Sequence, residues 1–103
     1  MTEMVERLQG ISFHDAEVVA VRLDRTGVVM DLEIDMAAPV RAARALRLRF
    51  DGVSNLRLAD FNEQNSLFDL TLVWSEDAAL WDVVLQPNYG LAGSFRCRAL
   101  TLT

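Results

Sequence analysis

The sequence contains one cysteine, one histidine, two prolines and no lysine among its 103 residues. A single cysteine excludes a disulfide within the chain and a cysteine-based zinc site. A single histidine excludes HExxH enzymes and other metal sites that need two histidines. No apolar run approaches the roughly 20 residues that cross a bilayer, and the first residues lack the apolar segment of a signal peptide. We therefore expect a cytoplasmic protein with no metal, no cofactor and no membrane association.

What is present is typical of one globular domain spanning residues 1–103, with 51% hydrophobic and 24% charged residues. The net charge of −5 argues against binding to nucleic acid. Charge is uneven, because residues 60–103 contain six acidic residues and only two arginines. An acidic surface attracts basic partners and speeds their association. A second interpretation of the same charge is a solvated surface that maintains solubility.

The hydrophobic pattern predicts mainly strands. Residues 2–9 fit a short helix, which begins at a Thr N-cap and ends at Gly10. Apolar residues then alternate with polar ones over residues 17–24 and 28–36, around a loop containing Gly27, which predicts a hairpin. Residues 37–43 fit either a helical turn or a loop.

The next alternating runs cover residues 46–50 and 56–58, on either side of Asp51-Gly52. A two-residue turn there would place the two leucine rows on opposite faces. We therefore predict a hairpin loop of three or five residues. Acidic residues 31, 33 and 35 would face one side of their strand, and Arg47 and Arg49 one side of the next, so we expect cross-strand ion pairs.

The C-terminal half continues the alternation. Residues 66–74 place Phe68, Leu70, Leu72 and Trp74 on one face, residues 81–85 form the next strand, and residues 87–90 interrupt it. In the last strand the apolar residues change from odd to even positions near Ala99, which predicts a bulge. The fold class is therefore mainly β: about seven antiparallel strands in a curved sheet or a sandwich, with one short N-terminal helix.

One segment brings an imidazole near carboxylates. His14, Asp15 and Glu17 could form an alternative polar site, with His14 as a general base oriented by a carboxylate. His14 and Asp15 would need a turn to meet, because adjacent residues of an extended chain point to opposite faces. We favour a structural role, in which His14 bonds to backbone and Asp15 caps a turn.

The densest polar cluster is residues 60–65, which offers both hydrogen-bond donors and acceptors. These polar residues either stabilise a turn between two strands or form a recognition loop held by the sheet. With the acidic residues that follow, it makes our candidate partner-binding set. The set is Asp60, Asn62, Glu63, Gln64, Asn65, Glu76, Asp77 and Asp82.

Two other features are more typical of a core. Trp74 and Trp81 flank one turn in near-opposed positions, which predicts a cross-strand aromatic pair, or an interface anchor if either is exposed. Cys97 lies between apolar residues of one face, so we interpret it as a core residue and not as a nucleophile.

Three segments together resemble small bacterial immunity proteins of the immunity protein 50 type and related uncharacterised proteins. They are residues 13–18 (FHDAEV), residues 48–65 with LRFDGV and DFNEQN, and residues 89–97 (YGLAGSFRC). The resemblance implies a cytoplasmic antidote that binds and neutralises a secreted toxin domain. It assigns no active-site residue to this chain.

We therefore expect a non-enzymatic binding protein whose partner is a protein, such as a basic toxin domain. Two alternatives stay open. One is a small enzyme or ligand-binding domain that uses residues 13–17, and the other is a self-associating structural module. The sequence leaves the oligomeric state and the toxin undetermined.

Overall fold

The two alternating runs near the N-terminus form a hairpin in the computed structural model, which describes residues 11–26, 28–40 and 43–102. Strand β1, Glu17–Asp24, pairs antiparallel with β2, Val29–Val40. The inward row of β2, which includes Met30, Leu32 and Ile34, is buried. The predicted helix over residues 2–9 lies outside the described residues.

Strand β3, Ala43–Asp51, continues the meander beside β2. Its register places Arg49 opposite Asp31 and Arg47 opposite Glu33, so the predicted charge pairing across the ladder is confirmed. The sequence predicts a helical turn or a loop over residues 37–43. Both interpretations are wrong for residues 37–40, which extend β2 as strand, and for residue 43, which begins β3; residues 41 and 42 lie outside the described residues. The proline at position 39 is tolerated there because the ladder between β2 and β3 is interrupted between Asp35 and Val40.

The chain changes layer after β3. Only two residues lie between the end of β3 and the start of strand β4, Ser54–Ala59, but β4 pairs with β7 instead of β3. The predicted hairpin loop of three or five residues is therefore wrong. The leucine rows still share one core, because Leu48 is buried and Leu56 and Leu58 pack against the buried cluster from the other layer. Gly52, at φ 66°, provides the left-handed backbone for this crossing.

Three further strands form two hairpins: β5, Ser66–Ser75, β6, Leu80–Tyr89, and β7, Ala92–Cys97. Strand β6 continues through Pro87, so the predicted break falls later, at Gly90. Irregularities in the β5–β6 ladder near Leu67 put that side chain in the core and leave Phe68 exposed. Our placement of Phe68 on the apolar face was wrong, because a bulge reverses which face a residue occupies.

The last strand, β8, Ala99–Leu102, lies in the other layer beside β3. The phase jump near Ala99 is therefore not a bulge within one strand. The chain leaves β7 at Cys97, and the backbone N–H of Arg98 donates to the carbonyl of Asp51 at 2.9 Å at the crossing. This layer change accounts for eight strands where about seven were predicted.

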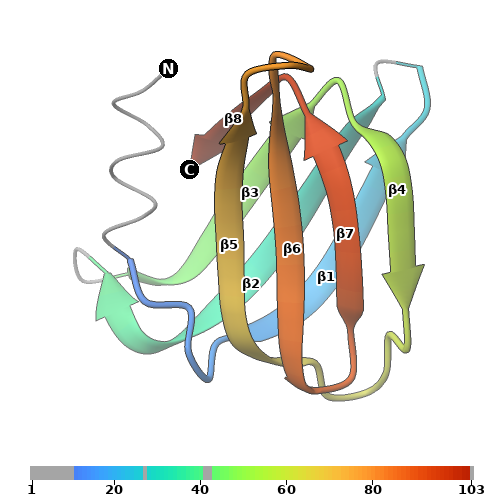
Figure 1. Cartoon of the computed structure of the whole chain (residues 1–103). Helices are drawn as coiled ribbons and strands as arrows, with labels where there is room; N and C mark the ends of the chain where they lie inside the picture. The colour runs from blue at the N-terminus through green and yellow to red at the C-terminus, as the bar shows by residue number, and fades with distance from the viewer. Residues whose placement is uncertain (1–10, 27, 41–42, 103) are drawn as a thin grey trace.

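In the described part of the chain, eight antiparallel strands form one sheet in the order β4-β7-β6-β5-β1-β2-β3-β8. The sheet folds on itself where β1 and β5 pair at Glu17 and Ser66. We call β5, β6, β7 and β4 the front layer, and β1, β2, β3 and β8 the back layer (Figure 1). The mainly β fold class is confirmed, and no helix occurs in the described residues. The largest core side chains lie between the layers: Phe13, Met30, Leu32, Ile34, Leu48, Phe50, Leu67, Leu85 and Leu91.

Candidate functional site

The segment containing the lone histidine lies at the junction of the two layers. The turn that His14 and Asp15 need in order to meet is present, with Asp15 at φ 64°. Phe13 and Ala16 on either side are buried, which fixes the turn against the core. The backbone N–H of Asp15 donates to the carbonyl of Leu67 at 2.8 Å, so the turn is joined to β5.

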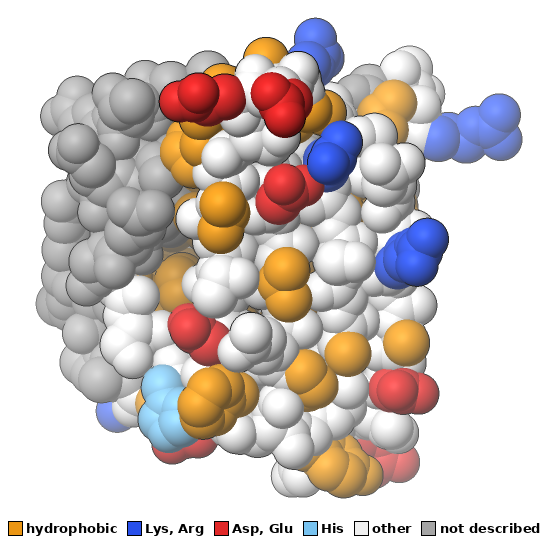
Figure 2. Space-filling model, in the orientation of Figure 1, with side chains coloured by type: hydrophobic (Ala, Val, Ile, Leu, Met, Phe, Trp, Pro, Cys, Tyr) orange, Lys and Arg blue, Asp and Glu red, His pale blue; other side chains and the backbone are white. Residues whose placement is uncertain are grey.

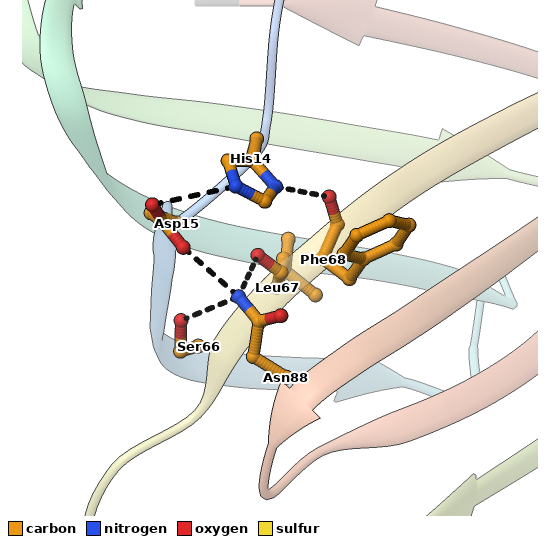
Figure 3. A network of polar contacts seen from close by, with 6 residues as sticks. All are labelled: His14, Asp15, Ser66, Leu67, Phe68 and Asn88. Atoms are coloured by element: carbon orange, nitrogen blue, oxygen red, sulfur yellow. Dashed lines mark hydrogen bonds and ion pairs between the residues drawn. The ribbon is translucent and has the colours of Figure 1, made fainter.

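A network of polar contacts surrounds this turn (Figure 3). His14 Nδ1 lies 3.2 Å from the carbonyl oxygen of Phe68, and His14 Nε2 lies 3.5 Å from Asp15 Oδ2. Asn88 Nδ2, from β6, donates to Asp15 Oδ1 at 3.0 Å and to the carbonyl of Leu67 at 2.9 Å. Sequence reasoning missed Asn88, because 73 residues separate it from Asp15 and an Asn after a proline suggests only a turn.

The arrangement at this junction serves mainly to join strands. Both His14 and Asp15 are more than half exposed, and the imidazole packs edge-to-face on Phe68 with ring centroids 5.4 Å apart. Glu17 is not part of the network; it pairs in the strand ladders opposite Asp35 and Ser66. The structural interpretation of His14, in which it contacts backbone, agrees with this geometry.

Asn65, in the loop of residues 60–65, faces the interior instead of the surface. It is only 2% exposed. Its side-chain oxygen accepts hydrogen bonds from the backbone N–H groups of Asn62 and Leu91, and its nitrogen donates to the carbonyls of Asn62 and Val18. The prediction that Asn65 contacts a partner is therefore wrong, because the buried amide forms hydrogen bonds with backbone groups of its own loop, of Val18 and of Leu91.

The other predicted partner-binding residues are exposed or half-exposed but do not form one patch. Asp60, Asn62, Glu63 and Gln64 lie in the loop before β5, and Glu76 and Asp77 lie in the turn after it. A ten-residue strand separates the two groups by about 30 Å. Asp82 lies between them on β6, where it accepts a hydrogen bond from Arg96 Nε at 2.8 Å.

The tryptophans form the predicted pair across the β5–β6 hairpin. Trp74 and Trp81 are directly opposite, with ring centroids 5.1 Å apart and planes at 60°. Trp81 is buried, whereas Trp74 is 42% exposed. Cys97 is fully buried, and burial raises the pKa of its thiol to about 11. The thiol therefore stays protonated at neutral pH, as expected for a core residue.

Two arginine–carboxylate ion pairs join β2 and β3 in the back layer. Arg49 contacts Asp31 through two hydrogen bonds, at 2.9 and 3.1 Å, and Arg47 contacts Glu33 at 2.8 Å. The hydrogen bonds from Arg49 hold the pKa of Asp31 below its usual value, although burial of that carboxylate acts in the opposite direction. Four of the outward charges of this layer are therefore paired within the fold.

Within residues 11–26, 28–40 and 43–102, no group of three or more His, Cys, Asp or Glu side chains is arranged to hold a metal ion. The same residues include no helix of the length and apolarity that crossing a bilayer requires. Neither observation assigns a function.

Comparisons with known proteins bear on the fold alone. No family model and no curated protein matches this chain. The chain is similar to the crystal structure of an uncharacterized protein from Neisseria gonorrhoeae, with a TM-score of 0.63 and 9% sequence identity. The match covers 86% of this chain and 90% of that chain, so the similarity extends over nearly the whole fold.

Proposed function

We propose that this chain is a non-enzymatic, cytoplasmic binding protein that neutralises a bacterial toxin domain, as immunity proteins do. The resemblance of residues 13–18, 48–65 and 89–97 to the immunity protein 50 type supports this role. The partner is a protein, and the net charge of −5 would steer a basic toxin domain toward it.

The outer face of the front layer is the proposed binding surface. Here Val73 and Val84 lie among polar side chains, 60% and 36% exposed. Apolar groups beside charged ones on a rigid sheet are typical of a protein interface. The single observation that supports this choice is the contrast with the back layer, where Asp31 and Glu33 are already paired with arginines.

Co-expression with the toxin domain encoded beside this gene tests the function. We expect a stable complex and protection of cells that express the toxin. A double variant, Val73→Glu with Val84→Glu, should weaken the complex at least tenfold. Val19→Glu is the matched control, because Val19 is 52% exposed on the back-layer strand β1 and should leave affinity unchanged. No complex and no protection would refute the proposal.

A second function is favoured by one observation, the contact between His14 and Asp15 at the layer junction. In a small enzyme or ligand-binding domain, this pair and Asn88 would bind a polar ligand. Such a role predicts that His14→Ala abolishes ligand binding, whereas it would leave the toxin complex intact. Measuring both with one variant distinguishes the two functions.

A further inference from the structure

A groove of about 560 Å³ crosses three strands on the outer face of the front layer. The register aligns its walls in two rows. Val84 of β6 lies opposite Ser94 of β7, which lies opposite Arg57 of β4. In the next row, Asp82 lies opposite Arg96. Asn55 of β4 also lines the groove.

The groove is hollow because of small residues in β7. The short side chain of Ser94 lies between the longer side chains of Val84 and Arg57, which leaves a depression in the middle of the row. Beside it, Gly93 permits close approach of β4, since an added Cβ would lie 2.5 Å from Leu58 and 2.9 Å from the backbone oxygen of Arg57. The groove is therefore built into the β7–β4 ladder.

An irregularity in β4 shapes the other wall. The register shifts between Ser54 and Arg57, and Asn55 adopts φ 52°. Irregularities of this kind bend a strand and change the direction of its side chains. β4 is also the terminal strand of the sheet, so the groove opens at a free edge.

The charge of the groove is positive although the chain is acidic. The groove is lined by two guanidinium groups, of Arg57 and Arg96, and by one carboxylate, of Asp82. Arg96 uses its Nε for that carboxylate, and Arg57 forms no ion pair with any described residue. The hydroxyl of Ser94 and the amide of Asn55 add further hydrogen-bond donors. Figure 2 shows most of the arginine side chains of this face toward its β7–β4 side, with acidic ones spread from its top to its bottom.

We propose that this groove receives a carboxylate side chain of the protein partner, with Arg57 as the principal contact. The inference rests on the proposed function and names the contact chemistry. Arg57 can donate two parallel hydrogen bonds to one carboxylate. Ser94 and Asn55 line the same groove and can donate further hydrogen bonds to the bound carboxylate. The long-range field of the acidic chain attracts a basic partner, whereas this local site fixes the orientation of the bound complex.

The first test uses the complex with the toxin domain. Arg57→Gln should weaken binding at least tenfold, and most of the loss should disappear at high salt, where charge contacts contribute less. Arg44→Gln is the control, since Arg44 is exposed on β3 of the back layer. Arg57 is exposed at a sheet edge, so the variant should melt at the same temperature as the parent protein. A complex whose affinity is unchanged by Arg57→Gln would overturn the inference while leaving the proposed function standing.

A second test is independent of the toxin. A hexaglutamate peptide added to the isotopically labelled protein should shift the backbone NMR signals of Asn55, Ser94 and Arg96, and a hexaglutamine peptide should not. The shifts should vanish in Arg57→Gln. Absence of these shifts, or equal shifts caused by inorganic phosphate, would overturn the assignment to a carboxylate even if the toxin complex forms.

Discussion

The two layers use their outward-facing polar residues differently. On the back layer, arginines of β3 lie directly opposite carboxylates of β2 and pair with them. On the front layer, Asp82 and Arg96 form one such pair, while Arg57 has no ion-pair partner among the described residues and Val73 and Val84 are exposed. The same strand alternation therefore pairs four outward charges between β2 and β3 and leaves Arg57 of the front layer available to a partner.

The difference follows from which residues the register brings together. In the back layer, Asp31 and Glu33 of β2 lie opposite arginines of β3 and pair with them, whereas Asp35 lies opposite Ala45. In the front layer, Arg57 meets Ser94, which cannot neutralise it. Neighbouring strands of similar composition can thus differ in what they offer to a partner.

The largest effect should come from Asn65→Ala, which tests whether the front layer is held by buried bonds and not by its outward charges. The substitution leaves the backbone N–H groups of Asn62 and Leu91 without their acceptor. An unsatisfied buried group costs about 1–3 kcal/mol. Leu91 is buried and Asn62 is exposed, so we expect a loss of about 2–3 kcal/mol in unfolding free energy, most of it from the Leu91 N–H. Denaturant titration measures it. Asn62→Ala is the control, since Asn62 is exposed, and an equal loss there would refute the interpretation.

The next effect compares the two layers directly. Asp31→Asn should lower the unfolding free energy by about 1–2 kcal/mol, because the charge-assisted bonds from Arg49 are lost at a carboxylate that is almost buried. Asp82→Asn should cost about 0.5 kcal/mol or less, because that pair is well exposed to solvent. Equal losses in the two variants would contradict the distinction between the layers.

The pH dependence of stability should also depend on the back layer. The pKa of Asp31 is lowered in the folded state by the hydrogen bonds from Arg49. The pair therefore stabilises the fold fully above the unfolded pKa of about 3.9, and the contribution is lost as pH falls through the lower folded value. Thermal melts between about pH 5 and pH 2 should show a shallower decline for Asp31→Asn than for the parent. If the melting temperatures of the two proteins fell in parallel with pH, Asp31 would not contribute to the pH dependence of stability.

Alternation in the sequence was sufficient to predict the strands and the ion pairs of β2 and β3. It could not predict the layer changes at residues 52–53 and at Arg98, because a period of two shows which face a residue occupies but not which strand lies beside it. Leu48, Leu56 and Leu58 meet one core whether β3 and β4 form a hairpin or lie in different layers. The sequence therefore could not distinguish these topologies.

The candidate sites were harder to predict for a related reason. Asn65 is of a residue type that is common in turns, so the sequence suggested an exposed position. It is buried because the fold places Val18 and Leu91, which are distant in the sequence, beside it. Arg57 and Arg96 are 39 positions apart and meet only through the β4–β7 ladder. Counts of charge along residues 60–103 therefore predicted an acidic surface, whereas the front layer carries an arginine groove between two acidic ends.

A small effect should also come from His14→Ala, at the junction that both layers share. The imidazole contacts the Phe68 carbonyl at 3.2 Å and the Phe68 ring edge-on, but it is more than half exposed, so water replaces most of what is lost. We expect a loss below about 1 kcal/mol in denaturant titration. Asn88→Ala, which removes the bond to the Leu67 carbonyl, should cost more, because that bond joins β6 to the β5 irregularity. A larger loss for His14→Ala than for Asn88→Ala would mean that the imidazole, and not the amide, holds the layers together at this corner.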